Sequence, residues 1–205
     1  MQHPADDKDS EWITTHFEYH SMEENLLKLD MLGHDDPTMI RMLEDMTGVD
    51  AQKIPLDDQD TMSIFTSSKV LGYENDPILG PVGSVAIPEF GTGFTRGMLQ
   101  ETQPTKFDTL IRLSGFSHGT DVWLGNAQDL VRQGVPLREC ICTRDDIMNA
   151  LIDFGVDSEI AFKTMESVRK GRGLTPEMEQ AMRENNVPEY YVDSCKKIKY
   201  MFPKA

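Results

Sequence analysis

The sequence lacks the features that would place this chain in a membrane or outside the cell. No stretch approaches the roughly 20 consecutive apolar residues that a membrane-spanning helix needs. Residues 1–12 are polar and acidic, without the apolar core of a signal peptide. The three cysteines, Cys140, Cys142 and Cys195, form no CxxC pair, which argues against a disulfide framework and against a structural zinc site. We therefore expect a protein of the reducing cytoplasm, with free thiols in or near its core and no membrane partner.

Positive charge is scarce as well. The chain has 20 Lys and Arg against 35 Asp and Glu, a net charge of −15. Taken alone, this balance argues against nucleic acid, whose phosphates select for Lys and Arg. However, residues 1–60 hold 16 acidic and 4 basic residues, whereas the remainder holds 19 and 16. Two stretches are basic, because residues 163–173 have four bases and one acid and residues 194–204 have four bases and no acid. These two stretches are the candidates for contact with phosphate.

What the sequence does contain is enough apolar material for a globular chain. Hydrophobic residues make up 39% and charged residues 27% of the 205 residues, which indicates one folded domain or two small ones. Residues 25–31 alternate between apolar and polar and predict a short strand. Asp36 and Pro37 predict the start of a helix, with Asp36 as its N-cap and Gly48 at its end.

The rest of the chain predicts helices around one irregular connection. A short helix is expected over residues 60–67, capped by Asp57 or Asp58. Residues 72–91 are rich in Gly and Pro and predict the connection. Helices are then predicted at 93–102, 106–114, 121–133, 144–154, 158–169, 176–185 and 188–198. Two of them are preceded by pairs with capping-box spacing, Thr105 with Asp108 and Thr143 with Asp146.

Asp30 is a candidate metal ligand on the predicted strand. A carboxylate on a strand before a glycine turn is one way to hold Mg²⁺, which takes one or two carboxylates together with phosphate oxygens. Strand alternation puts Lys28 on the same face, where an amine and a carboxylate could meet one triphosphate. The plainer interpretation, an ordinary surface ion pair, stays open.

Further candidates lie in a turn and in the two basic stretches. In the turn Ser117-His118-Gly119-Thr120-Asp121, Gly119 permits close backbone approach, and a helix starting near Asp121 would offer free N–H groups to an anion. The plainer interpretation is a capped turn in which His118 makes a hydrogen bond. The basic candidates for phosphate contact are Lys163, Arg169, Lys170 and Arg172 around a glycine-rich bend, and Lys196, Lys197 and Lys199 near the end of the chain. Without further information these clusters can equally be solvated helix faces. Phe116 and Trp123 could stack on a base, although core packing is the safer interpretation.

Seven runs spread over the whole chain carry a specific resemblance. They are 12–17 (WITTHF), 25–43 (NLLKLDMLGHDDPTMIRML), 87–91 (IPEFG), 114–127 (SGFSHGTDVWLGNA), 144–148 (RDDIM), 165–173 (MESVRKGRG) and 191–205 (YVDSCKKIKYMFPKA). In sequence and in order, these runs resemble the polymerase core of PolC-type bacterial DNA polymerase III α subunits.

The resemblance implies a replicative DNA-directed DNA polymerase, a nucleotidyltransferase that adds deoxynucleotides to a primer 3′-hydroxyl. It implies the C-terminal part of a nucleotidyltransferase-type palm over residues 1–71, the connection over 72–91, and a helical fingers array over 92–205. Two Mg²⁺ ions would be held by three aspartates, of which Asp30 matches the third, with Lys28 beside it in the catalytic site. Ser117, His118 and Gly119 match the fingers turn near the incoming nucleotide. The implied partners are primer–template DNA, deoxynucleoside triphosphates and, in an intact enzyme, the sliding clamp and other replisome subunits.

The chain also departs from the family pattern. The first two aspartates lie in a family motif upstream of this sequence, and the exonuclease, oligonucleotide-binding and PHP-like regions have no counterpart here. The run around Arg96 varies, which puts a nucleotide role for Arg96 in doubt. We expect a truncated fragment that is inactive alone. Composition by itself favours an alternative, an acidic helical interaction module without catalysis, whereas a metal-dependent hydrolase would need a cluster of His and carboxylates that the sequence does not show.

Overall fold

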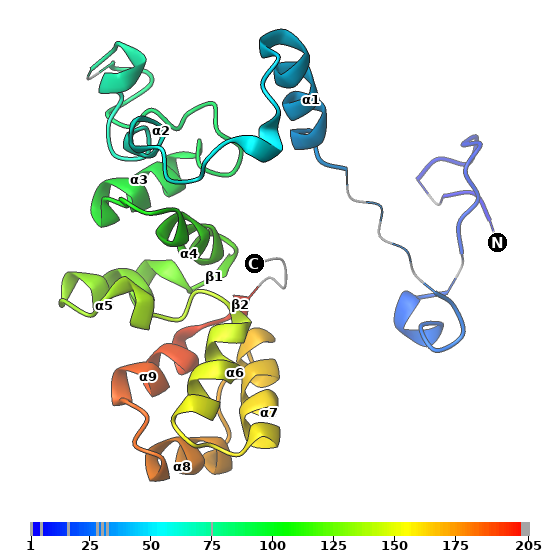
Figure 1. Cartoon of the computed structure of the whole chain (residues 1–205). Helices are drawn as coiled ribbons and strands as arrows, with labels where there is room; N and C mark the ends of the chain where they lie inside the picture. Colours follow the sequence, from blue (N-terminus) through cyan, green and yellow to red (C-terminus); the bar gives the residue numbers. More distant parts are fainter. Residues whose placement is uncertain are drawn as a thin grey trace. The chain divides into compact units, whose positions relative to one another are not determined.

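The computed structural model describes residues 2–4, 6–15, 17–27, 29, 31, 33–74 and 76–201. The chain divides into two compact units, Met1–Lys53 and Ile54–Ala205, each of which is described by itself (Figure 1). The described residues are mainly helical with one small two-stranded sheet, which confirms the predicted fold class at this level. No helix in the described part is long and apolar enough to cross a bilayer.

The N-terminal unit contains the helix α1 (Asp36–Thr47) and two 3-10 helices, η1 (Tyr19–Ser21) and η2 (Ala51–Lys53). α1 begins one residue earlier than the sequence predicts, with Asp35 rather than Asp36 as its N-cap, because Asp36 already has helical geometry. It ends as predicted, at Gly48 with a φ of +70°. No described side chain of this unit is buried.

The strand predicted over residues 25–31 is absent from the described residues of that stretch, which are 25–27, 29 and 31. Residues 22–25 form a turn, in which the N–H of Leu26 donates to the carbonyl of Met22 at 3.0 Å. An alternating segment becomes a strand only when a neighbour pairs with it, and the described residues supply none here. Lys28 and Asp30 themselves lie outside the described residues.

The C-terminal unit is built from helices that follow one another through short turns (Figure 1). They are α2 (Gln59–Ser63), η3 (Lys69–Leu71), α3 (Gly93–Thr102), α4 (Phe107–Ser117), η4 (Trp123–Ala127), α5 (Gln128–Arg132), η5 (Leu137–Glu139), α6 (Arg144–Asp153), α7 (Ser158–Arg169), α8 (Pro176–Glu184) and α9 (Glu189–Lys197). The described part of residues 72–91 holds turns and bends, as predicted.

Side-chain caps explain where several helices begin. The Asp58 carboxylate accepts from the Thr61 N–H at 2.8 Å, so Asp58 rather than Asp57 caps α2. Thr143 and Asp146 form the predicted capping box at α6. The box predicted from Thr105 and Asp108 is wrong: α4 starts at Phe107, one residue later than predicted, so Lys106 rather than Thr105 stands at the N-cap, and no side chain caps the helix.

Four consecutive helices, α5 to α8, end in the same way. The residue after each C-cap has a left-handed φ, at Gly134 (+92°), Gly155 (+97°), Gly171 (+70°) and Asn186 (+56°). The next N–H then reaches back five residues, in the bonds Val135 to Leu130 (2.9 Å), Val156 to Leu151 (2.9 Å), Arg172 to Ser167 (2.9 Å) and Val187 to Met182 (3.0 Å). These are Schellman motifs, whose following residue is commonly apolar and packs on the helix. That following residue is a valine after α5, α6 and α8, but it is Arg172 after α7.

The single helix predicted over residues 121–133 is broken in the structure. Asp121 has a φ of +58°, and Leu124 and Gly125 have non-helical backbone angles inside η4. Only α5 is regular. Asn126 explains the break, because its buried side chain donates to the Asp121 carbonyl at 2.9 Å and accepts from the Ser194 hydroxyl at 2.7 Å. A long-range hydrogen bond to α9 thus overrides the local helical pattern.

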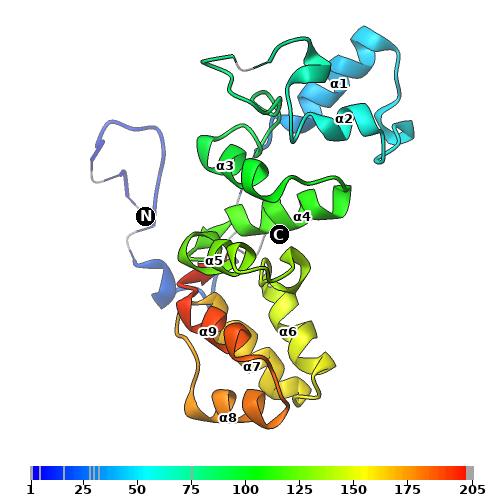
Figure 2. The ribbon, with the colours of Figure 1, turned by 90° about the vertical axis from the view of Figure 1, so that its left-hand side faces the viewer.

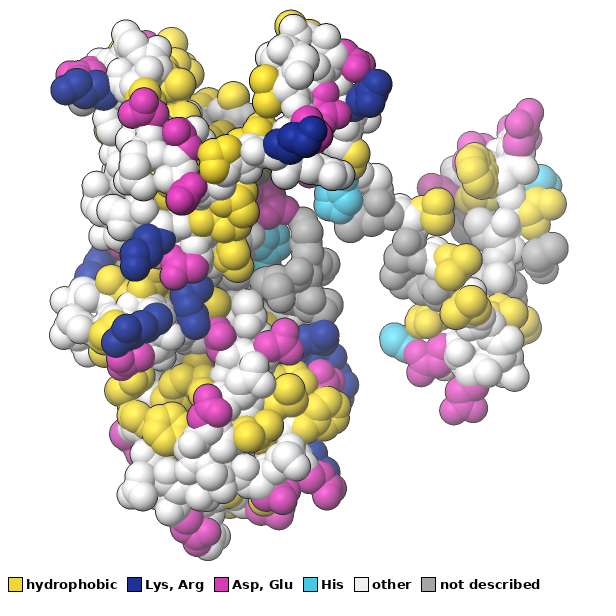
Figure 3. Space-filling model, in the orientation of Figure 1, with side chains coloured by type: hydrophobic (Ala, Val, Ile, Leu, Met, Phe, Trp, Pro, Cys, Tyr) yellow, Lys and Arg dark blue, Asp and Glu magenta, His cyan; other side chains and the backbone are white. Residues whose placement is uncertain are grey.

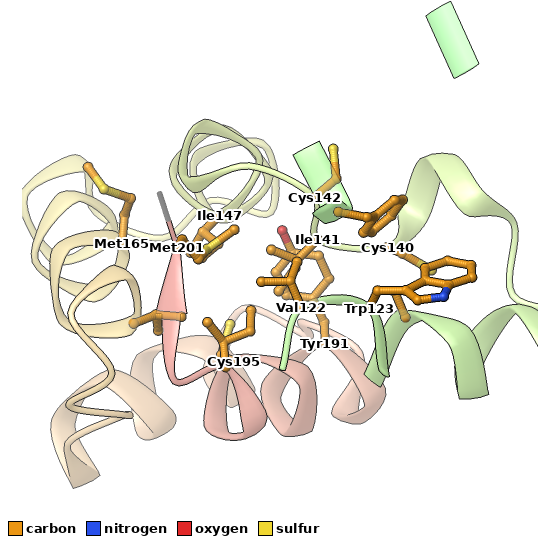
Figure 4. Packing of buried hydrophobic residues seen from close by; sticks show 14 of the residues in the cluster. Val122, Trp123, Cys140, Ile141, Cys142, Ile147, Met165, Tyr191, Cys195 and Met201 are labelled. Atoms are coloured by element: carbon orange, nitrogen blue, oxygen red, sulfur yellow. The ribbon is translucent and has the colours of Figure 1, made fainter. Parts of the chain in front are cut away.

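The core of the C-terminal unit is a single cluster of buried apolar side chains that runs from α2 to the end of the described chain. Cys140, Ile141 and Cys142 lie in its centre, between Trp123 and the α6–α9 part (Figure 4). The Trp123 ring packs on Phe116 with 5.3 Å between ring centroids, so core packing is confirmed for both rings. All three thiols are free and buried, as expected.

Candidate functional site

The small sheet joins three segments that sequence analysis singled out separately. β1 (Gly119–Thr120) pairs antiparallel with β2 (Tyr200–Met201), with Gly119 opposite Met201 and Thr120 opposite Tyr200. The Lys199 N–H donates to the Thr120 carbonyl at 3.1 Å. α7 also packs on β2, which brings in the glycine-rich bend. We call the assembly of residues 117–120, 169–173 and 196–201 the junction; it lies between the α3–α5 part and the α6–α9 part of the unit (Figures 1 and 2).

The turn at residues 117–119 is held by several hydrogen bonds. His118 Nδ1 lies 2.5 Å from the Ser114 carbonyl oxygen and 3.2 Å from Ser117 Oγ. Its Nε2 lies 3.7 Å from the Glu89 carboxylate. Glu89 belongs to the IPEFG run and has an unusual φ of +67°. The hydrogen-bonding role given to His118 in the plainer interpretation is therefore present.

Gly119 makes a close backbone approach, but its neighbour is protein. A Cβ at this position would lie 2.5 Å from the Tyr200 carbonyl oxygen. The helix N-terminus predicted near Asp121 is absent, because Asp121 has a left-handed φ and η4 begins only at Trp123. That proposed source of free N–H groups is therefore wrong, for the same reason that the predicted helix is broken.

Four of the seven basic candidates are engaged in ion pairs. Lys163 pairs with Glu159 at 2.6 Å, and Lys196 pairs with Glu179 at 2.8 Å. The Glu166 carboxylate accepts two bonds from Arg169, both 2.9 Å, and lies 3.2 Å from the Lys170 amine. Its hydrogen bonds from Arg169 lower the pKa of Glu166 to about 2. These four cations are partly neutralised where they stand.

Arg172, Lys197 and Lys199 differ from the other four. All three are exposed, and none makes an ion pair within the described part of the chain. All three belong to the junction. Figure 3 shows dark-blue side chains along the edge where α7 meets the end of the chain. The structure thus brings together the turn, the bend and the last basic cluster, and leaves Lys163 outside this group, more than one turn back along α7.

The position of Arg172 in its helix cap is a second indication of a binding role. Its backbone is fixed by the Schellman motif of α7, yet its side chain points to solvent where α6 and α8 bury a valine. A backbone held by hydrogen bonds, under an exposed guanidinium that pairs with no described carboxylate, suits recognition of a phosphate. The signal is visible in the sequence, since Gly134, Gly155 and Asn186 are each followed by valine and Gly171 by arginine. Sequence analysis included Arg172 for its charge and missed this pattern.

The sequence predicts the helix cap at Asp146 but not the polar cluster that surrounds this carboxylate. The Asp146 carboxylate accepts from the N–H groups of Cys142 and Thr143 at 3.0 and 3.1 Å and from the Cys142 thiol at 2.9 Å, and Arg112 bonds it at 3.3 Å. Burial raises the pKa of Cys140 to about 11 and of Cys195 to about 12. Burial and then the Asp146 charge also raise the pKa of Cys142. The thiols are therefore protonated near neutral pH, which suits structure rather than nucleophilic chemistry.

The predicted metal site has no counterpart that can be described. Asp30 and Lys28 lie outside the described residues. Among the residues that the structure does describe, no three His, Cys, Asp or Glu side chains gather closely enough to hold a metal ion. The assignment of Asp30 to Mg²⁺ therefore rests on the resemblance alone.

Comparison with known proteins identifies the family. Residues 36–189 match the finger domain of the bacterial DNA polymerase III α subunit. The DNA polymerase III PolC-type of Staphylococcus epidermidis is 60% identical over the whole chain, which covers 14% of that protein. Those of Caldanaerobacter subterraneus and Staphylococcus aureus are 59% and 58% identical, again over the whole chain, which covers 15% and 14% of them. The match includes residues on both sides of 72–91, and the division into palm and fingers stays a prediction. The chain belongs to the PolC-type DNA polymerase III family and contains the finger domain of its α subunit.

Proposed function

We propose that this chain is the nucleotide- and template-holding part of a cytoplasmic replicative DNA polymerase and that it does not polymerise DNA by itself. The observation that carries the proposal is the junction, where Arg172, Lys197 and Lys199 are exposed, without an ion pair to any described residue, on a backbone fixed by β1, β2 and the α7 cap. Three cations on ordered backbone suit the triphosphate of an incoming nucleotide or the phosphates of a template strand.

The chemistry of the intact enzyme follows from family membership. Template-directed addition to a primer 3′-hydroxyl needs charge stabilisation of an in-line transfer, which a pair of Mg²⁺ ions supplies when bound. Asp30 is proposed as one carboxylate of that site, with Lys28 beside it. The sliding clamp and other replisome subunits are proposed as partners of the intact enzyme. The residues of this chain bind and orient phosphates; the remaining aspartates come from outside it.

Binding of DNA by the chain itself tests the proposal. Fluorescence anisotropy with a labelled primer–template and the matching nucleotide is measured over a range of salt concentrations. Replacing Arg172, Lys197 or Lys199 with Ala should each weaken binding and reduce the slope of log K against log salt by about one. Lys106→Ala is the matched control: Lys106 is exposed and makes no ion pair within the described part, but it stands at the other end of α4 from the turn. Equal affinity and slope in all four variants would contradict the proposal.

Primer extension tests the catalytic part. The 205-residue chain should extend no primer, because one aspartate cannot hold two Mg²⁺ ions at the separation that two-metal catalysis needs. In a full-length PolC-type polymerase that contains this segment, Asp30→Asn should preserve folding and remove most incorporation. Extension by the purified chain that disappears in its Asp30→Asn variant would overturn the first statement. Near-normal turnover of the full-length variant would overturn the second.

The alternative of an interaction module draws support from α1. Its apolar residues are all exposed within the N-terminal unit: Met39, Ile40, Met42, Leu43 and Met46. An amphipathic helix without a buried face is suited to contact another protein surface. If the chain binds neither nucleotide nor primed DNA, this function becomes the better description.

A further inference from the structure

Two glycines of the junction lie directly against the same short stretch of backbone, residues 199–201. A Cβ at Gly171 would overlap the Lys199 carbonyl oxygen and lie 2.9 Å from the Lys199 carbonyl carbon. A Cβ at Gly119 would lie 2.5 Å from the Tyr200 carbonyl oxygen and 3.4 Å from the Met201 Cα. At Gly171 all the nearest obstacles are main-chain atoms, which cannot turn aside as a flexible side chain can; at Gly119 the nearest is also a main-chain atom, with the Val122 side chain 2.8 Å away. Residues 199–201 are therefore positioned by the absence of side chains at two sites 52 residues apart in sequence.

We propose that Gly119 and Gly171 are positioning residues, which seat the backbone of residues 199–201 so that Lys199 and Arg172 present their charges to the same phosphate group or adjacent phosphates. The inference deepens the proposed function and rests on it. Neither glycine contacts the ligand in this proposal. Both act by leaving room for the backbone of residues 199–201.

Helix capping alone does not explain the glycine at position 171. Gly171 occupies the left-handed position of the α7 Schellman motif, where glycine is favoured for its φ of +70°. Asn186 fills the same position of α8 with a φ of +56°, so a side chain is compatible with the motif. Gly134, at the same position of α5, has no atom within 4 Å of a built Cβ. Gly171 is distinguished from them by the Lys199 carbonyl.

The backbones that carry Arg172 and Lys199 are each fixed by hydrogen bonds close to these two residues. Arg172 directly follows Gly171, and its N–H is bonded to the Ser167 carbonyl. Lys199 is fixed from the opposite side, since its N–H donates to the Thr120 carbonyl and Ile198 before it is buried. A side chain at position 171 must push residue 199 away, which breaks the bond to Thr120, or displace the bend that bears Arg172. Either movement separates the two charges without removing them.

The test uses asparagine, which tolerates a left-handed φ, so that overlap rather than backbone strain is varied. Gly171→Asn is compared with Gly134→Asn in the 205-residue chain. The first readout is hydrogen exchange at the Lys199 amide, which should be about tenfold faster in Gly171→Asn and unchanged in Gly134→Asn, since loss of one hydrogen bond opens a local segment. This readout requires no ligand.

The second readout is the salt dependence of primer–template binding. Gly171→Asn should lower the slope of log K against log salt by about one, as Arg172→Ala does, although every cation is still present. Adding Lys199→Ala to Gly171→Asn should then change affinity less than it does in the parent chain. A change that merely lowers the folded fraction leaves the slope as it was. Circular dichroism gives the folded fraction. If Gly171→Asn does not fold, Gly119→Ala is the second variant; it has a smaller overlap with the Tyr200 carbonyl but adds backbone strain at a φ of +147°.

The outcomes separate the inference from the function on which it rests. If Gly171→Asn and Gly134→Asn agree in exchange and in salt slope, the positioning role is wrong while the proposed function stands. Faster exchange with an unchanged slope leads to the same conclusion. If Arg172→Ala, Lys197→Ala and Lys199→Ala all bind as the parent chain does, the proposed function fails and the positioning role fails with it.

Discussion

Asp146 shows at the residue scale how far sequence reasoning reaches and where it stops. Its capping box with Thr143 is a local pattern, and the sequence predicts it correctly. Its bond to Arg112 comes from tertiary packing, because Arg112 lies 34 residues away. Of the candidate site, the sequence supplies the charges and the glycines, but not which cations are already neutralised by a neighbouring carboxylate.

Replacing Asp146 with Asn should lower the free energy of unfolding by about 2 kcal/mol, because a partly buried carboxylate that accepts five hydrogen bonds is replaced by an amide that matches only some of the donors. Urea unfolding checks this. Asp145→Asn is the matched control, since Asp145 is the exposed neighbour on the same helix and should cost less than about 0.5 kcal/mol. Identical midpoints for the two variants would contradict the prediction.

Glu166 gives a pH dependence of stability. Its pKa falls from 4.5 to about 2 on folding, chiefly through the hydrogen bonds from Arg169. A lowered folded-state pKa stabilises the protein above the unfolded pKa, and that contribution is lost as pH falls from about 4.5 toward 2. We therefore expect the urea midpoint of the parent chain to drop more between pH 5 and pH 3 than that of Glu166→Gln. Parallel drops would show that the pair does not contribute.

At the scale of elements, local patterns predict regular helices well and fail where a distant residue intervenes. The bounds of α3 and α7 agree with the sequence to the residue, because both have clear caps and an apolar stripe. The sequence failed at residues 121–133, where Asn126 bonds to α9 and Gly125 takes a left-handed φ. It also failed at residues 25–31, where alternation alone cannot provide a partner strand. The β1–β2 pair was not predicted because two-residue strands leave no periodic signal.

The hydrogen bonds of Asn126 should make it the residue that holds η4 to α9. Asn126→Ala leaves the buried Ser194 hydroxyl and the partly buried Asp121 carbonyl without their partner, so we expect a loss of about 2 kcal/mol in the free energy of unfolding. Thermal unfolding is the measurement, with Asn149→Ala on the exposed face of α6 as control. If Asn126→Ala and Asn149→Ala unfold at the same temperature, the buried hydrogen bonds of Asn126 do not stabilise the break in the helix.

At the scale of the whole molecule, the two units differ in how much they bury. The core cluster begins at Met62, and no described side chain of Met1–Lys53 is buried. Burial of apolar surface is the main stabilising term in folding. The N-terminal unit therefore has little buried apolar surface to stabilise it against local unfolding. The sequence predicted the helix α1 and its apolar stripe, but composition does not show that this stripe would stay uncovered within its own unit.

Limited proteolysis should therefore proceed in two stages. Trypsin is expected to cut first within residues 1–53, at Lys8, Arg41 or Lys53, and to leave the second unit, Ile54–Ala205, largely intact. Hydrogen exchange should show the same order, with fast exchange in the first unit. Mass spectrometry of the early fragments checks the prediction. Early cuts within α6 or α7 would contradict it, because these helices pack against each other in the core.

The Trp123–Phe116 pair has a consequence for optical spectroscopy. The indole of Trp123 is 3% exposed inside the core, whereas Trp12, the second tryptophan of the chain, is 79% exposed. An indole in an apolar interior emits at shorter wavelength and is reached poorly by a water-soluble quencher, whereas a hydrated one is red-shifted and quenched readily. The intrinsic emission of the folded chain is therefore a sum of two resolvable components, one from each unit. A Trp12→Phe chain would report on the finger core alone, without any attached dye.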